Sequence, residues 1–117
     1  MNRIILVGRL TKGPDMKVRE DTGKVITRFT IAVEREYKNP NGERDVDFIP
    51  VVLWGRKAEA AAEFMKKGSL ISVCGRLANR SYEDDQGIRR YISEVVADSF
   101  QFIDTRKNDE GTMQKAE

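Results

Sequence analysis

Aromatic side chains share one face of the segment Val46–Trp54, whose residue types alternate with the period of a β-strand. The odd positions after Asp47 are aliphatic and suit a hydrophobic core, whereas Phe48 and Trp54 lie on the opposite face. A separation of six residues places these two side chains about 20 Å apart along a strand. Such a face can stack on flat rings such as nucleobases, or it can be buried inside a sandwich or a subunit interface. The spacing alone leaves both interpretations open.

The segment Leu70–Tyr82 has the same two-faced pattern, with one aliphatic face and one small, polar and basic face that ends in an aromatic residue. A further aromatic–basic pair, Tyr37 and Lys38, opens the loop that follows Glu36. The candidate ligand-binding residues are therefore four aromatics, Tyr37, Phe48, Trp54 and Tyr82, and five cations, Arg35, Lys38, Arg56, Arg76 and Arg80.

Aromatic and basic residues in this arrangement are typical of a surface that binds nucleic acid. Stacking on an aromatic ring contributes about 1–3 kcal/mol per base whatever the base sequence, while Arg and Lys follow the phosphates. The total charge adds nothing to this argument, because 21 Lys and Arg against 19 Asp and Glu leave only +2. An isolated Arg is usually a solvated surface charge, so it is the clustering beside aromatics that favours nucleic acid.

An enzymatic function finds little support among the residue types. The sequence has no histidine, no Gly-rich phosphate loop of the Walker type, and no nucleophile with a base beside it. Two carboxylate pairs lie in or beside turns, where Asp is common for backbone reasons: Asp45 with Asp47, and Asp84 with Asp85. Cys74 is the single cysteine, so a zinc site has almost no ligands. We expect no catalytic residue, no metal and no cofactor.

Five strands and one helix are expected to position the candidate residues. Apolar alternation and turn signals predict strands over residues 4–10, 25–36, 46–54, 70–82 and 90–102. The alanine-rich segment Arg56–Lys67 predicts a helix that ends on Gly68 as a left-handed cap. Three strands, one helix and two strands is the order of an all-β, five-stranded OB-fold barrel with a helix between its third and fourth strands. A two-layer α+β sandwich is the alternative.

The length of 117 residues suits one domain, which we place at residues 1–105. Apolar residues almost vanish from Arg106 onward, so residues 106–117 are predicted to be a short disordered tail. No apolar run approaches the roughly 20 residues of a membrane span, and the apolar stretch after Met1 is too short for a signal peptide. A lone cysteine fits a reducing compartment, and we expect the protein to be cytoplasmic.

Six short motifs occur in a characteristic order: MNRIILVGRLTK at residues 1–12, DFI and VLW within 47–54, KKGSL at 66–70, GRL at 75–77 and SYE at 81–83. Together they resemble bacterial single-stranded DNA-binding proteins over roughly residues 1–104. The resemblance implies an OB barrel that assembles as a homotetramer, associates with the nucleoid, and protects single strands during replication, repair, recombination or DNA uptake. Its stacking positions match Tyr37, Phe48, Trp54 and Tyr82, with Tyr or Phe at some positions where other members carry Trp.

The sequence departs from that family at two places. Pro50 stands where relatives usually have a polar residue, and its missing backbone donor predicts a strand edge or a bulge. Residues 106–117 hold three basic and three acidic side chains and close with Glu117, whereas housekeeping members close with an acidic, aromatic-ended tip that recruits replication and repair proteins. A short paralogue or a truncated chain fits this ending. We expect no recruitment of such proteins through a C-terminal tip.

Three functions remain open from the residues themselves: a sequence-independent binder of single-stranded DNA, an OB module that binds a protein, and an RNA-binding OB domain. The aromatic and basic face favours the first over the second. Only the resemblance separates DNA from RNA.

Overall fold

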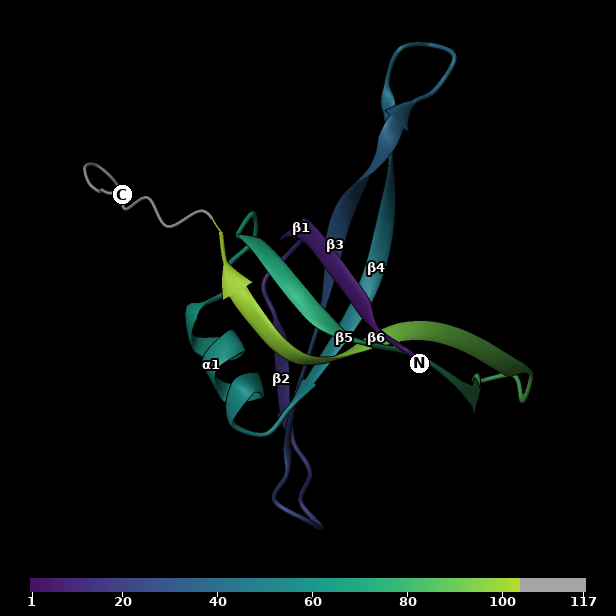
Figure 1. The fold of residues 1–117 in the computed structure, drawn as a ribbon. Coiled ribbons are helices and arrows are strands. Elements are labelled where there is room, and N and C mark those ends of the chain that lie inside the picture. Colours follow the sequence, from purple (N-terminus) through teal and green to yellow (C-terminus); the bar gives the residue numbers. More distant parts are fainter. Residues whose placement is uncertain (104–117) are drawn as a thin grey trace, which may run out of the picture.

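A single sheet of six strands curls into a barrel that carries one helix in the computed structural model, which describes residues 1–103 (Figure 1). The strands are β1 (Ile4–Leu10), β2 (Asp15–Val18), β3 (Val25–Lys38), β4 (Arg44–Trp54), β5 (Leu70–Glu83) and β6 (Arg89–Phe102), and α1 (Arg56–Phe64) lies between β4 and β5. The strand order is β1-β5-β6-β4-β3-β2, and an additional pairing of β1 with β3 closes the barrel. The predicted all-β OB barrel with one helix is thereby confirmed.

The short strand β2 pairs with β3 outside the five barrel strands, and the sequence analysis missed it. All of its four residues are exposed. Met16 and Val18 do alternate with Asp15 and Lys17, but the run has only four residues, the shortest length at which alternation indicates a strand. Counted with β2, the helix follows the fourth strand rather than the third.

The hydrophobic core fills the barrel with aliphatic side chains from all five barrel strands. Its largest fully buried members are Ile31 of β3, Val51 and Leu53 of β4, Ile71 and Val73 of β5, and Val95 of β6. Val52 stands on the same parity as Phe48 and Trp54 but is buried at the point where β4 pairs in parallel with β6. The two faces of β4 are therefore not divided as cleanly as its alternation indicates.

The helix closes one end of the barrel through Ala58 and Ala61 and ends earlier than predicted. The residue after Phe64, Met65, has an extended backbone and a side chain that is buried in the core, so the chain leaves the helix axis there. Gly68 does have a left-handed φ of 88°, but it lies in the following turn, where its N–H donates to the carbonyl of Leu10. It is therefore not the cap of α1.

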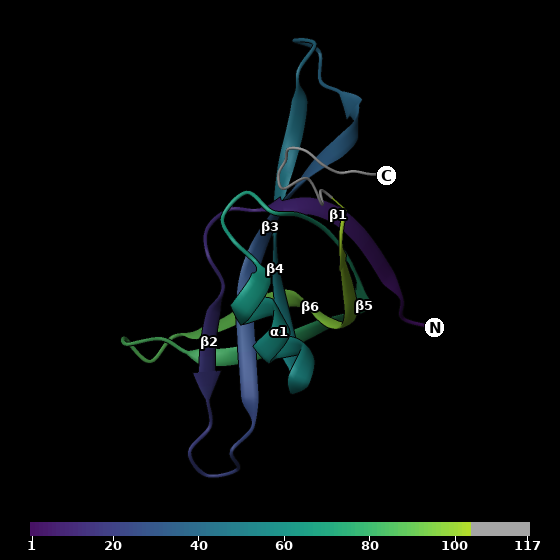
Figure 2. The same ribbon diagram turned by 90° about the vertical axis from the view of Figure 1, so that its left-hand side faces the viewer.

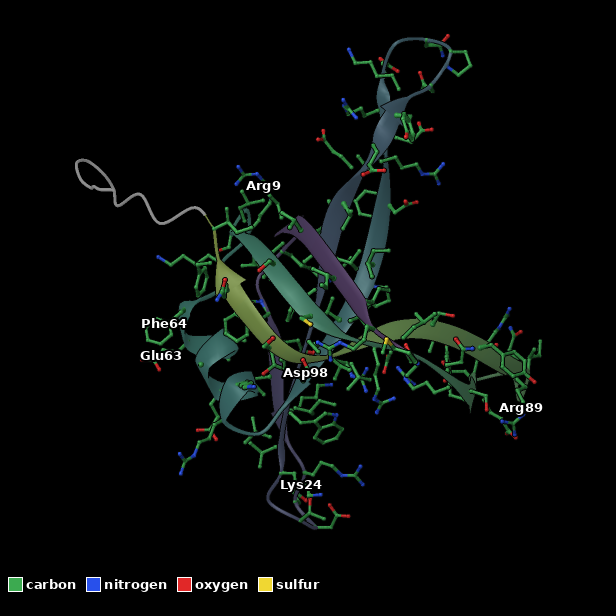
Figure 3. All side chains as sticks on the ribbon, in the orientation of Figure 1. Arg9, Lys24, Glu63, Phe64, Arg89 and Asp98 are labelled. Carbon is green, nitrogen blue, oxygen red and sulfur yellow. The ribbon has the colours of Figure 1, made fainter. Side chains whose placement is uncertain are left out.

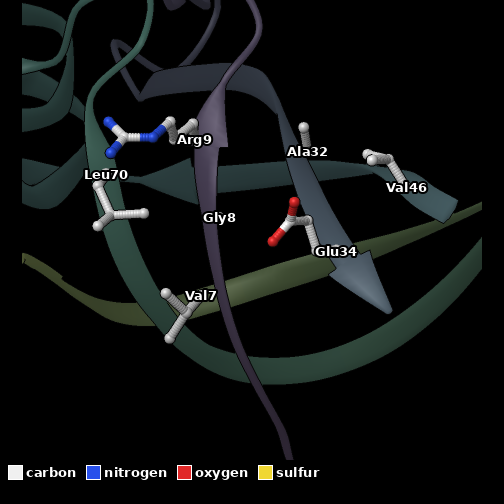
Figure 4. Close-up of a pocket in the computed structure, with 7 residues that line it drawn as sticks. All are labelled: Val7, Gly8, Arg9, Ala32, Glu34, Val46 and Leu70. Carbon is white, nitrogen blue, oxygen red and sulfur yellow. The ribbon is translucent and has the colours of Figure 1, made fainter. Parts of the chain in front are cut away.

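A close approach of β1 to β3 at Gly8 allows the barrel to close. A Cβ at this position would lie 2.5 Å from the carbonyl oxygen of Ala32, so any larger residue would push the strands apart. Figure 4 shows the strand passing Ala32 and Glu34 here, beside a hollow of about 490 Å³ that Val7 and Val46 also line. Glycine at this point is a packing requirement.

Three hairpins project from the barrel in different directions (Figure 1, Figure 2). We call residues 34–46 the β3–β4 arm and residues 79–92 the β5–β6 arm; the third hairpin joins β2 to β3. Asx turns begin the tips of both arms: Asn39 Oδ1 accepts from the backbone of Asn41, and Asp84 Oδ1 accepts from the backbone of Gln86. Both tips coincide with the loop and the hairpin turn predicted from sequence.

Candidate nucleic-acid interface

Strand register brings the even-numbered residues of four strands onto one face. Arg28 of β3 lies opposite Val52 of β4, and Val52 in turn pairs with Val96 of β6. Since residues paired across a sheet point to the same side, the parity continues from β6 into β5, where Arg80 lies opposite Ile92. The binding face, as we call it, comprises Arg28 and Thr30 on β3; Phe48, Pro50 and Trp54 on β4; Ile92 and Glu94 on β6; and Arg76, Arg80 and Tyr82 on β5.

All four candidate aromatics are exposed to solvent on the chain. Phe48 is 65% exposed, Trp54 41% and Tyr82 45%, and Tyr37 stands out on the β3–β4 arm. The interpretation that Phe48 and Trp54 fill the inside of a sandwich is therefore wrong for the folded chain. The guanidinium carbon of Arg80 lies 5.8 Å from the centre of the Tyr82 ring, so one aromatic already has a cation over it.

Trp54 lies beside cations from two separate segments. Its side chain lines a hollow of about 430 Å³ together with Lys24 and Arg56, and Arg19 lines an adjoining one. Gly55, whose φ of 74° suits glycine, turns the chain from β4 into α1 and so brings Arg56 next to Trp54. Figure 3 shows Lys24 on the β2–β3 hairpin. Sequence reasoning included Arg56 among the candidates and missed Lys24 and Arg19.

The cation Arg35 is held in an ion pair on the β3–β4 arm. Its Nη2 donates to Asp47 Oδ1 at 2.9 Å, and its Nη1 lies 4.0 Å from a carboxylate oxygen of Asp45. This hydrogen bond lowers the pKa of Asp47 and raises the pKa of Arg35. Lys38 on the same arm forms no ion pair within residues 1–103. The two predicted cations of this arm therefore differ in the charge they present to a ligand.

Arg80 is bonded to a carboxylate that the sequence analysis overlooked. Glu94 of β6 is buried, and its Oε1 accepts from Arg80 Nε at 3.2 Å and from Arg28 Nη1 at 3.1 Å. The three side chains line a hollow of about 260 Å³, which Lys12 and Pro50 also line. The available signal for Arg28 was its parity, since it lies on the face of β3 opposite the buried row of Phe29 and Ile31.

Pro50 precedes the two residues at which β4 pairs with β6, Val51 and Val52. It retains its pairing with Thr30 of β3 on the other side. At Pro50 the strand therefore has a registered partner on one side only, which is the edge position that its missing N–H predicted. Of the two predicted alternatives, an edge and a bulge, the edge is correct.

A closed OB barrel with exposed aromatics and cations on one face belongs to the class of OB proteins that bind single-stranded nucleic acid. The model of the single-strand binding protein family matches residues 1–103, and the chain belongs to this family. As a member it is a binding protein and not an enzyme.

Several relatives resemble the chain over most of its length. It is 52% identical over 107 residues to single-stranded DNA-binding protein 1 of Clostridium acetobutylicum, which covers 92% of this chain and 97% of that protein. It is 49% identical over 104 residues to the single-stranded DNA-binding protein of Clostridium tetani, with 89% of this chain and 71% of that protein covered. It is 50% identical over 111 residues to single-stranded DNA-binding protein 2 of Listeria innocua, with 95% and 69% covered. Within residues 1–103, no helix is long and apolar enough to cross a membrane.

Proposed function

We propose that this chain binds and protects single-stranded DNA, without sequence preference, by stacking unpaired bases on Tyr37, Phe48, Trp54 and Tyr82. The observation that carries the proposal is the binding face itself, where exposed aromatics from separate strands share one surface with cations. Every base offers a flat π-face, so such a surface tolerates any sequence. The names of the relatives support DNA as the nucleic acid.

Phosphate contacts in this proposal come from Arg35, Lys38, Arg56, Arg76 and Arg80. Lys38, Arg56 and Arg76 form no ion pair within residues 1–103, so their charges are available to a strand. Arg35 would have to exchange Asp47 for a phosphate, which reduces its net contribution. Arg80 is bonded to Glu94 through its Nε.

The test is quenching of the fluorescence of Trp54, the single tryptophan, by oligo-dT, oligo-rU and duplex DNA in parallel. We expect strong quenching by oligo-dT and weak quenching by the duplex, because paired bases are stacked on each other and cannot reach the ring. Tighter binding of oligo-rU would favour an RNA-binding domain. No quenching by either single strand, together with DNA affinity unchanged by Tyr37→Ala, would favour a protein-binding module.

We further propose that the protein assembles as a homotetramer. Residues 4–8 of β1 pair with β5 but have no registered partner on their other side within residues 1–103. On this strand Ile5 is 71% exposed and Val7 48%, and an open apolar edge is a surface that usually becomes covered. Light scattering should give four times the chain mass of 13.4 kDa; a mass of one chain at micromolar concentration would refute the assembly.

Two further parts of the proposal concern the cellular setting. We propose a cytoplasmic, nucleoid-associated protein in DNA replication, repair, recombination or uptake, with residues 1–105 as the DNA-binding domain.

The predicted tail, residues 106–117, lies outside the described residues. Its three basic and three acidic side chains cancel, so we propose that it neither competes for the binding face nor recruits partners as an acidic tip. Deleting it should leave affinity for oligo-dT unchanged, and a large change would contradict this.

A further inference from the structure

A buried carboxylate lies at the centre of the binding face, where the bound strand carries negative charge. The side chain of Glu94 is only 8% exposed, and it stands on β6 between β5 and β4. A carboxylate at this position opposes an anionic ligand unless it serves another purpose. Its contacts indicate that purpose.

Glu94 joins two cations that come from strands on opposite sides of it. Arg80 reaches it from the neighbouring strand β5, and Arg28 reaches it from β3, across β4. Both guanidiniums donate to the same oxygen, Oε1, at 3.2 and 3.1 Å. One buried acceptor therefore fixes the positions of two long side chains that would otherwise rotate freely. Fixing a donor in advance reduces the ordering cost of binding.

Most donors of the two guanidiniums remain available. A guanidinium carries five N–H groups, and within residues 1–103 each of these two makes one hydrogen bond, the bond to Glu94. Arg28 and Arg80 are 45% and 42% exposed. Because Arg80 is held through Nε, both of its Nη groups stay free for a second anion, and a pair of N–H groups is the geometry that suits a phosphate.

The local charge also favours an anion. Two arginines and Lys12 line the hollow, against Glu94 and Asp15, which leaves a net charge of +1 from three cations and two carboxylates. Arg28 lies opposite Val52, on the stretch of the binding face between Phe48 and Trp54. A DNA strand whose bases stack on Phe48 and Trp54 therefore has its phosphate backbone close to this hollow.

We propose that Arg28, Glu94 and Arg80 form a preorganised site for a phosphodiester group of the bound strand, in which the arginines contact phosphate and Glu94 is a positioning residue. The site rests on the proposed function, because it needs a single strand on the binding face. It adds Arg28 as a contact and gives the buried carboxylate a role.

The variant Glu94→Gln distinguishes a positioning role of Glu94 from an effect of total charge, because the two predict opposite changes in affinity for single-stranded DNA. If only total charge mattered, removing a negative charge from the binding face would tighten binding. If Glu94 positions the arginines, removing its charge weakens binding, by about tenfold for the loss of one well-oriented charged contact. Asp15→Asn is the matched control, because Asp15 lines the same hollow but contacts neither arginine, its ion-pair partner being Lys17.

The experiment measures affinity for labelled oligo-dT by fluorescence anisotropy over a range of salt concentrations, for the full chain and four variants. Glu94→Gln should bind about tenfold more weakly, whereas Asp15→Asn should bind as the parent does or slightly tighter. Arg28→Ala should bind more weakly and lower the slope of log K against log salt by about 0.7, the value for one phosphate on a single strand. Trp54→Ala reports on stacking independently.

Unchanged or tighter binding by a folded Glu94→Gln variant, judged by circular dichroism and melting temperature, overturns the inference. If that variant does not fold, Arg28→Ala decides, since Arg28 is partly exposed and an unchanged salt slope overturns the site as well. If Trp54→Ala loses affinity for oligo-dT while Arg28→Ala and Glu94→Gln bind it as the parent does, the phosphate site is contradicted and the proposed function is not. Failure of the parent chain to bind oligo-dT contradicts the proposed function instead.

Discussion

Replacing Phe48 with Ala separates base stacking from packing, because the Phe48 ring is 65% exposed on the chain. A buried aromatic side chain covers about 150–250 Å², so the covered third of this ring amounts to roughly 70 Å². At about 25 cal/mol per Å², removing it costs at most about 1.8 kcal/mol in free energy of unfolding. The lost stacking should weaken binding of single-stranded DNA by about 1–3 kcal/mol, which is about 5- to 150-fold in affinity.

The matched control for this variant is Phe29→Ala on the neighbouring strand β3. Phe29 is only 6% exposed and belongs to the core, so its truncation should cost about 3–5 kcal/mol of unfolding free energy. Urea unfolding followed by circular dichroism measures stability, and anisotropy of labelled oligo-dT measures affinity. Stability loss by Phe48→Ala as large as that of Phe29→Ala, with unchanged DNA affinity, would show that Phe48 is a packing residue and refute the stacking argument.

The remaining predictions concern salt, backbone packing and acid. Log K for oligo-dT should fall linearly with log salt by about 0.7 per phosphate contacted, and a flat response in anisotropy titrations would remove the electrostatic part of the proposal. Gly75→Ala should destabilise the fold by about 1–3 kcal/mol, because its Cβ would collide with the backbone of β6. Gly13→Ala is the control, since a Cβ at Gly13 would meet open space, and thermal melts of the two variants test this difference. Hydrogen bonds from arginine lower the pKa of Asp47 and of Asp84. The stability that these carboxylates add to the fold is complete above their usual pKa of 3.8, and it is lost as the pH falls through the lower pKa of the folded state. An Asp47→Asn, Asp84→Asn double variant should therefore lose less stability than the parent on acidification below about pH 4, and equal losses in urea titrations would contradict this.

Most barrel strands were predictable because a buried face leaves a period of two in the sequence, and β1 was predictable as a short run of branched apolar residues. Ile31 and Leu53, for example, lie within alternating runs and are fully buried. Strand β2 gives a much weaker signal, since its alternation covers only four residues and none of them is buried. The end of α1 depends on the burial of Met65 against the barrel, which is a tertiary contact that helix propensity does not contain.

The residues of the candidate site were likewise predictable from the sequence only in part. The parity of β4 was sufficient to place Phe48 and Trp54 on one face, but it left open whether that face is exposed, which the folded barrel decides. The contact of Arg28 with Glu94 joins residues 66 positions apart and depends on the register of three strands. The ion pair of Arg35 with Asp47 likewise depends on pairing across the hairpin. Local patterns predict which way a side chain points, but its charged neighbours come from register.

The pairing of β1 with β5 also constrains how the protein emerges from the ribosome. Ile4 lies beside Gly75, and Arg9 lies beside Leu70, so residues 4–8 of β1 have no registered partner until β5 is synthesised, although Arg9 and Leu10 also pair with the earlier strand β3. Until then its edge is open and carries Ile5 and Val7, and exposed apolar surface beside an unpaired strand edge makes a partly folded chain prone to aggregation. Barrel closure therefore cannot precede the synthesis of β5 and β6.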